Sequence, residues 1–154
     1  MNITLTGLLF TFAFMALPAW WDASRRQKVT GEVNAYPTSR TEPWFEKYQE
    51  QARESLRKST GADLQMWMTD DSFDQVVRYY RAMGVERPEF AKSLAKMLSD
   101  KTGREVNATY VIFDGAEGPV LSKHYVSIQR PVVVRYAPLE VHDVTVIGLF
   151  RSKK

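Results

Sequence analysis

The chain has 154 residues, of which 44% are hydrophobic and 25% charged, a composition typical of a globular domain with a short appendage. It contains no cysteine, which excludes disulfide bonds, a thiol nucleophile and thiolate-bound metal ions. Its 21 basic and 18 acidic side chains leave a net charge of +3, too small and too dispersed to indicate a nucleic-acid-binding protein.

The chain begins with an apolar run that has no charged side chain before Asp22. As a helix, residues 3–21 would extend about 28 Å, close to the thickness of the hydrocarbon core of a bilayer. Trp20 and Trp21 end the run, where aromatic side chains favour the membrane–water interface. We therefore predict that residues 1–21 form a single transmembrane anchor. A cleaved signal peptide is the alternative, because the sequence LPA before Trp20 suits a signal peptidase.

Residues 22–42 have the composition of a linker, with Gly31, Pro37 and no sustained hydrophobic period. Arg25, Arg26 and Lys28 follow the apolar run directly, and the positive-inside rule would place the rest of the chain in the cytoplasm. We predict that residues 43–154 form one folded domain.

A helix is predicted over residues 43–59, with Pro43 at its first position. Glu42, Glu46, Glu50 and Glu54 recur every four residues and form an acidic ridge along it. A carboxylate metal site on a helix usually adds a histidine at helical spacing or a second acidic helix. The ridge is therefore interpreted as a solvated helix face.

Residues 62–69 alternate between apolar and polar, which predicts a strand with one buried face. A second helix follows and ends near Gly84, and Ser72 with Gln75 three residues later matches a capping box. The adjacent Asp70 and Asp71 are interpreted as helix caps rather than acid–base groups.

A third helix is predicted over residues 88–101, and β-strands account for the rest of the chain. The strands are expected at residues 105–113, 120–130, 132–136 and 141–150. Short turns between successive strands imply antiparallel pairing. The predicted fold is thus α+β: a transmembrane helix, then a small domain of about three helices and an antiparallel sheet of four to five strands, in which residues 62–69 also pair.

The segment MTDDSFDQVVRYYRAMG, residues 68–84, resembles a pattern in small bacterial exported or membrane-tethered domains of unknown function. YPTSR at 36–40 and DVTVIGLF at 143–150 resemble the segments that precede and close that pattern. Two features depart from it, since Thr38 stands where the family has glycine and a charged helix is predicted at 43–59. The resemblance implies a bacterial origin and a domain outside the cytoplasm, in the periplasm, tethered to the inner membrane.

We expect no enzymatic activity, no cofactor and no metal site. The two histidines, His124 and His142, both fall in predicted strands and make no metal-ligand spacing. His142 precedes Asp143, but adjacent strand residues point to opposite faces, and no nucleophile motif such as G-x-S-x-G is present.

Two functions are compatible with these features. The first is a non-enzymatic accessory subunit of a larger bacterial membrane complex of respiratory or photosynthetic type, whose partners are lipid and other membrane-protein subunits. The residues expected at that membrane or partner interface are Gly7, Phe10, Phe14, Trp20, Trp21, Trp44 and Phe45. The second is a tethered or secreted periplasmic module that binds a small apolar or aromatic ligand.

Overall fold

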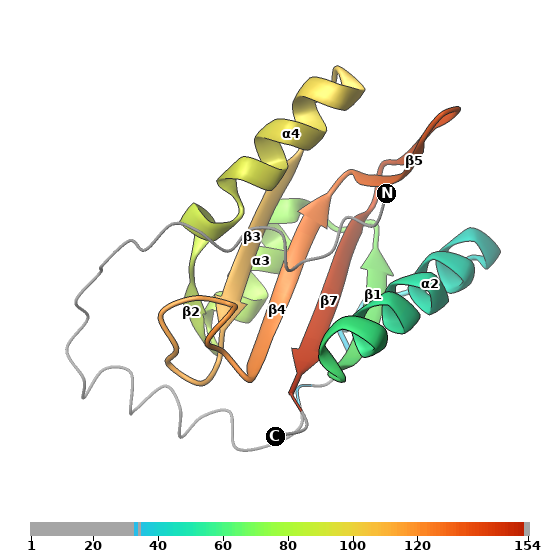
Figure 1. Cartoon of the computed structure of the whole chain (residues 1–154). Coiled ribbons are helices and arrows are strands. Elements are labelled where there is room, and N and C mark those ends of the chain that lie inside the picture. The colour runs from blue at the N-terminus through green and yellow to red at the C-terminus, as the bar shows by residue number, and fades with distance from the viewer. Residues whose placement is uncertain (1–32, 34, 153–154) are drawn as a thin grey trace.

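The computed structural model describes residue 33 and residues 35–152, which form an antiparallel five-stranded sheet with helices on both faces (Figure 1). The strand order is β1-β7-β4-β3-β2. The strands are β1 (Asp63–Thr69), β2 (Val85–Glu86), β3 (Asn107–Ile112), β4 (His124–Arg130) and β7 (Thr145–Arg151). A separate hairpin consists of β5 (Val132–Tyr136) and β6 (Leu139–His142). The helices are α2 (Pro43–Thr60), α3 (Phe73–Arg81), α4 (Lys92–Thr102) and the short 3₁₀ helix η2 (Pro88–Phe90).

The sheet separates two hydrophobic cores, because successive residues of each strand point to opposite faces. On the helix-pair face, α2, α4 and the β5–β6 hairpin cover side chains such as Met66, Tyr110 and Tyr125. On the α3 face, Val76 and Tyr80 of α3 pack over Ile128 and Ile147. The sheet is therefore covered on both faces, with one hydrophobic core on each. The predicted α+β class is confirmed.

The helix boundaries follow local sequence signals. Pro43 lies in the first turn of α2, and Gly61 ends the helix with φ of 69°, donating its backbone N–H to the carbonyl of Arg57 at 3.0 Å. The capping box of α3 is confirmed: Ser72 Oγ accepts a hydrogen bond from the backbone of Gln75 at 3.2 Å. In return, Gln75 Oε1 accepts one from the backbone of Ser72 at 2.9 Å.

Several predicted boundaries are wrong, for identifiable reasons. Residues 120–123 are not part of β4, because Asp114 holds the preceding loop by accepting hydrogen bonds from Ser122 Oγ at 2.8 Å and from the backbone of Lys123 at 2.7 Å. The predicted strand at 141–150 is divided in two, because the backbone of Val144 donates to His142 across a tight turn at 2.9 Å. As a result, β6 pairs with β5, while β7 lies in the middle of the sheet.

Part of the segment interpreted as a linker packs against the domain. Val33 and Tyr36 are buried on the α3 face, where the ring of Tyr36 contacts Tyr79 edge-on with centroids 5.1 Å apart. The backbone of Arg40 then donates to the carbonyl of Met68 at 2.9 Å. Residues 36–42 therefore run along the end of β1 before α2 begins.

Within residues 33 and 35–152, no helix has both the length and the apolar character that crossing a membrane requires. The anchor predicted for residues 1–21 lies outside the described residues.

Candidate functional site: a groove between two helices

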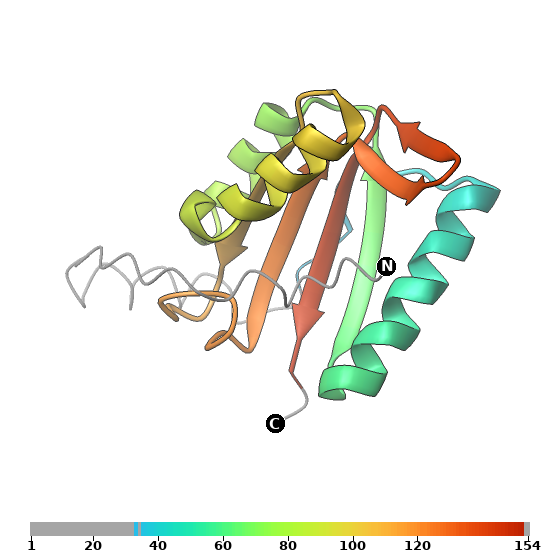
Figure 2. The same cartoon turned by 45° about the horizontal axis from the view of Figure 1, so that its top comes forward.

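A groove with a volume of about 390 Å³ lies on the helix-pair face of the sheet. One wall is α2, which contributes Tyr48 and Ala52, and the opposite wall includes Leu94 of α4. The β5–β6 hairpin closes one end, since residues 132–137 line the groove there. Figure 2 shows this hairpin between the C-terminal end of α4 and the N-terminal end of α2.

The groove exists because the middle of its floor carries small residues. Ser127 of β4 lines the floor and is paired with Gly148 of β7. Two strand positions further along, the paired residues are Tyr125 and Phe150, whose rings stack with centroids 4.7 Å apart and fill the same face. Protein interiors are otherwise closely packed, so a Ser–Gly pair among such residues leaves space between the two helices.

The lining of the groove combines aliphatic side chains with polar groups, and its polar surface is nearly as large as its apolar surface. The polar groups belong to Tyr48, Gln51, Ser55, Ser127, Gln129 and Tyr136. Burial raises the pKa of the Tyr48 hydroxyl, and the neighbouring Tyr136 adds to the rise. Burial also raises the pKa of Tyr136, so both tyrosines keep their protons at neutral pH.

One charged side chain, Arg135, lies among the described residues that line the groove. Its Nε contacts a carboxylate oxygen of Glu140 on the partner strand of the hairpin at 3.0 Å, and its side chain is 59% exposed. The charge is therefore paired at the surface of the hairpin rather than directed into the groove.

The hairpin is held against both helices by ring contacts. The indole of Trp44, in the first turn of α2, stacks on the imidazole of His142 in β6. His142 Nε2 also forms a hydrogen bond with a carboxylate oxygen of Glu140 at 2.9 Å. On the other side, the ammonium of Lys101 in α4 lies 4.8 Å from the ring centroid of Tyr136. These contacts fix the end wall of the groove between its two side walls.

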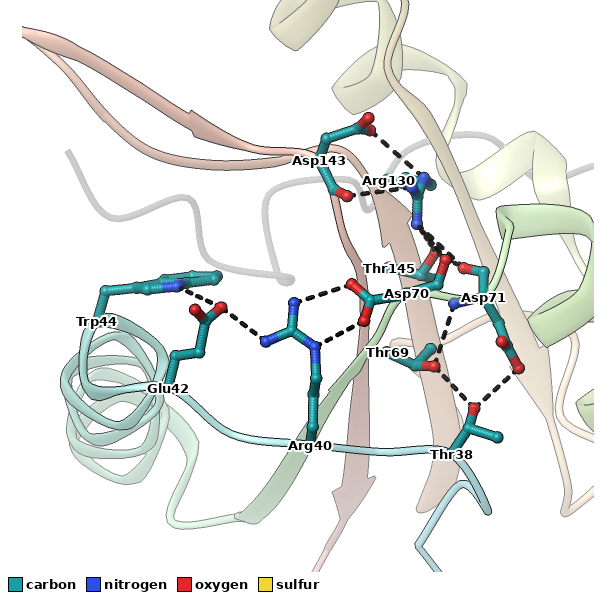
Figure 3. A network of polar contacts seen from close by, with 10 residues as sticks. All are labelled: Thr38, Arg40, Glu42, Trp44, Thr69, Asp70, Asp71, Arg130, Asp143 and Thr145. Carbon is teal, nitrogen blue, oxygen red and sulfur yellow. Dashed lines mark hydrogen bonds and ion pairs between the residues drawn. The ribbon is translucent and has the colours of Figure 1, made fainter.

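Arg130, at the end of β4, connects the end of β1 to the turn that follows the hairpin (Figure 3). Its Nη1 donates hydrogen bonds to the carbonyl of Asp71 at 3.1 Å and to Thr145 Oγ1 at 3.2 Å. Its Nη2 donates to the carbonyl of Asp143 at 3.0 Å. Since Thr145 Oγ1 itself donates to Asp71 at 2.7 Å, the three segments form one hydrogen-bonded unit.

The two aspartates predicted to cap α3 bind the segment before α2 instead. Asp70 accepts two hydrogen bonds of 2.8 Å from the guanidinium of Arg40, which lowers the pKa of its carboxyl. Asp71 Oδ2 accepts hydrogen bonds from Tyr36 and Thr38, both at 2.8 Å. Figure 3 shows how Thr38, Arg40 and the aspartates line up beneath Arg130. The cap of α3 is provided by Ser72.

The same polar network extends to the β5–β6 hairpin through Glu42 and Trp44. Arg40 Nη1 lies 2.9 Å from a carboxylate oxygen of Glu42, which also accepts a hydrogen bond from Trp44 Nε1 at 3.1 Å (Figure 3). Arg40 and Trp44 together lower the pKa of the Glu42 carboxyl. The network therefore orients the indole of Trp44, which in turn contacts the hairpin.

Of the residues predicted to lie at a membrane or partner interface, the structure describes Trp44 and Phe45. Phe45 is 2% exposed and packs in the core of the helix-pair face, so its ring is covered by this chain itself. Trp44 is half-buried against His142. The other five lie outside the described residues, and they are Gly7, Phe10, Phe14, Trp20 and Trp21.

The two histidines and the glutamates of α2, which were considered as catalytic or metal-binding groups, lie in different parts of the domain. His142 lies on the hairpin beside the groove, whereas His124 lies at the start of β4, against the ring of Phe113 at 4.9 Å. On α2, Glu46, Glu50 and Glu54 are exposed, and Glu54 pairs with Lys58 at 3.1 Å. No group of three or more histidine, aspartate or glutamate side chains in the described part of the chain is placed to hold a metal ion.

Comparisons with protein-family models, with curated proteins and with solved structures found no match. The resemblance of residues 68–84 to exported bacterial domains therefore stays a prediction.

Proposed function

We propose that this domain is a non-catalytic binding module that takes a small apolar or aromatic ligand in the groove between α2 and α4. The observation that carries the proposal is the groove itself, with about 390 Å³ of space and a lining that combines aliphatic side chains with neutral polar groups. Binding sites for small molecules are usually concave, mostly apolar and formed before the ligand arrives, and their few polar groups orient the ligand.

The contacts around the groove support a preformed site. The side walls belong to two helices packed on the sheet, and the end wall is attached to them through Trp44, His142 and Lys101. A site that is already ordered loses little conformational entropy when the ligand binds, which favours affinity for a ligand with few polar groups.

The proposal is tested by binding of a neutral fluorescent probe, phenylnaphthylamine, to the full chain. Ala52 lies half-buried in the α2 wall of the groove, so Ala52→Phe would place a ring in the binding space. Ala82 is exposed at the end of α3, so Ala82→Phe adds the same ring away from the groove. We expect Ala52→Phe to weaken saturable probe binding at least tenfold and Ala82→Phe to leave it unchanged. Equal probe binding by all three proteins would contradict the proposal.

A second candidate function, a subunit that docks on other proteins of a bacterial membrane complex, is favoured by exposed apolar side chains. Val120 and Leu121, in the loop before β4, are 55% and 62% exposed, and Leu139 at the tip of the hairpin is 49% exposed. Val120 and Leu121 are adjacent, and contiguous exposed apolar side chains mark sites of protein interaction more often than scattered ones do.

This second function predicts co-migration with a larger assembly in a native gel of mildly solubilised membranes. If the loop before β4 forms the contact, replacement of both Val120 and Leu121 by serine releases the chain from the assembly and Leu139→Ser does not. If the tip of the hairpin forms the contact, Leu139→Ser releases it instead. Retention in membranes after carbonate extraction, together with reporter fusions, would test the inner-membrane anchor and the periplasmic side. A chain that migrates alone in the native gel would remove this candidate.

A further inference from the structure

Basic side chains gather at the end of the groove that the β5–β6 hairpin closes (Figure 2). Arg135 of β5 lines the groove there and is exposed to solvent. The ammonium of Lys101, in the last turn of α4, lies 4.8 Å from the ring centroid of Tyr136, which lines the same end. Lys47 of α2 is exposed and lies near enough to Glu140 of the hairpin for its charge to act on that carboxyl. Three cations from three different elements therefore lie around one end of the groove.

One carboxylate of the hairpin accompanies these cations. Glu140 is the acidic residue among residues 132–142, and its oxygens contact Arg135 Nε at 3.0 Å and His142 Nε2 at 2.9 Å. The hydrogen bond with His142 lowers the pKa of the Glu140 carboxyl, and the charges of Arg135 and Lys47 lower it further. Glu140 is thus ionised at neutral pH and supplies one negative charge against three positive ones. The described residues that line the groove include no acidic side chain.

The guanidinium of Arg135 is suited to a second carboxylate. It contacts Glu140 through Nε, and a guanidinium carries five N–H donors, more than one such contact uses. Its planar fork matches the two oxygens of a carboxylate, which it binds through two parallel hydrogen bonds. Because the Arg135 side chain is exposed, the head group of a ligand can reach it from solvent at the surface of the hairpin.

The middle of the groove suits the uncharged part of such a ligand. Its side chains there include Leu56, Met66, Leu94 and Val146, and the polar groups beside them are neutral. Burying an ionised group without a partner is strongly unfavourable. A ligand with one negative charge would therefore keep that charge at the hairpin and place its apolar body between the two helices.

We propose that the groove takes an amphiphilic carboxylate, with its apolar or aromatic body between α2 and α4 and its carboxylate beside Arg135 at the surface of the hairpin. This inference rests on the proposed binding function and specifies the chemical class of the ligand.

The test uses three probes with the same ring system: naphthoate, acetylnaphthalene and naphthylmethylammonium, which are an anion, a neutral ketone and a cation. The carboxylate and acetyl groups have nearly the same size, so the first two probes differ in charge rather than in fit. Each probe is titrated into the full chain at low salt. We expect naphthoate to bind about 3- to 10-fold more tightly than acetylnaphthalene, because the cations are exposed and partly screened, and the ammonium probe to bind most weakly.

Two variants should change the affinity for naphthoate in opposite directions. Arg135→Met should reduce its advantage over acetylnaphthalene at least threefold, and Glu140→Gln should increase that advantage because it removes the competing carboxylate. The binding of acetylnaphthalene should stay unchanged in both. Arg78 is exposed on α3, on the opposite face of the sheet, so Arg78→Met removes the same charge away from the groove and should leave all three affinities unchanged.

The dependence on salt gives a measurement that needs no variant. Between about 0.1 and 1 M salt the Debye length falls from about 10 to about 3 Å, so the advantage of naphthoate should decrease while acetylnaphthalene keeps its affinity. Naphthoate that binds no more tightly than acetylnaphthalene, or that keeps its full advantage in Arg135→Met, would overturn the inference and leave the binding function standing. Failure of all three probes to bind would remove the binding function together with the inference.

Discussion

The indole of Trp44 and the imidazole of His142 stack with their ring centroids 3.7 Å apart and their planes 3° apart. Trp44 lies in the first turn of the helix that forms one wall of the groove, and His142 ends the hairpin that closes it. This contact therefore joins the end wall to the α2 wall.

The stacking energy is expected to appear as a coupling between the two side chains. Aromatic pairs contribute about 0.5–1.5 kcal/mol beyond the area they bury, so Trp44→Ala and His142→Ala should be non-additive by this amount in urea unfolding. Trp67 packs on the α3 face, so Trp67→Ala combined with His142→Ala should be additive. Additivity of the Trp44 and His142 substitutions would contradict a stabilising stack.

Arg130 is expected to be the most important charged residue for stability. Arg130→Met removes the side-chain donor of the Asp143 carbonyl and leaves the Asp71 carbonyl with the Thr145 hydroxyl alone, and the loss should be about 1–3 kcal/mol in urea unfolding. Arg130→Lys should recover part of this loss, because an ammonium cannot reproduce the fork of the guanidinium.

Arg135→Met is the matched control, since the exposed Arg135 forms its ion pair with the half-buried carboxylate of Glu140. It should destabilise the domain far less than Arg130→Met. Equal losses for Arg130→Met and Arg135→Met would mean that the backbone carbonyls are not what Arg130 stabilises.

The folded domain should lose stability as the pH falls from 7 to about 5.5, and His124 should be the cause. Burial lowers the pKa of His124, the charge of Arg151 lowers it further, and Asp114 opposes the change. Below the unfolded-state pKa of about 6.5, the unfolded chain binds the proton that the folded chain excludes. Stability is therefore complete above this pH and decreases as the pH falls through it.

The check is the free energy of unfolding of the wild-type chain and of His124→Gln across this range. The variant should show a flatter dependence of the unfolding free energy on pH than the wild type. Parallel curves for the wild type and His124→Gln would refute the assignment.

Gly84 should tolerate no side chain, although it comes at the end of a helical segment like Gly61. A Cβ at Gly84 would lie 2.7 Å from the carbonyl oxygen of Ile112 and 2.8 Å from the ring of Phe113. Such overpacking costs about 1–3 kcal/mol or more. A Cβ at Gly61 meets nothing within 4 Å, so Gly61→Ala should lose only the roughly 1–2 kcal/mol of a left-handed backbone conformation.

Thermal unfolding of Gly84→Ala and Gly61→Ala distinguishes steric overlap from backbone conformation. The expected order is a larger loss at Gly84, and the reverse order would show that Ile112 and Phe113 move aside at little cost.

The helices and most strands were predictable because their signals are local. The Pro43 start, the Ser72–Gln75 box and the Gly61 end each depend on residues within one or two helical turns. The division between β6 and β7 was not predictable in this way. Residues 141–150 are rich in β-branched and other apolar residues, and the turn formed by the backbone bond from Val144 to His142 is held by long-range contacts of Arg130 with Asp143 and Thr145.

Two small residues of the sequence, Ser127 and Gly148, mark the floor of the groove, but they indicate a groove only once the pairing of their strands is known. Ser127 interrupts a row of large inward-facing residues in β4, and Gly148 does the same in β7. Each is unremarkable alone, and they form a floor only because β4 and β7, distant in the chain, are neighbours in the sheet. The roles of Asp70 and Asp71 were missed for the same reason, since their partners Arg40 and Thr38 precede them by about 30 residues.

The most direct test of ligand binding in the groove is amide chemical-shift mapping of the isotopically labelled full chain during titration with acetylnaphthalene. Ligand binding in the groove predicts saturable shifts confined to residues around it, such as Ala52, Leu94, Ser127 and Val146. Shifts centred on the α3 face around Val77 and Ile147, or no saturable shifts at all, would contradict it.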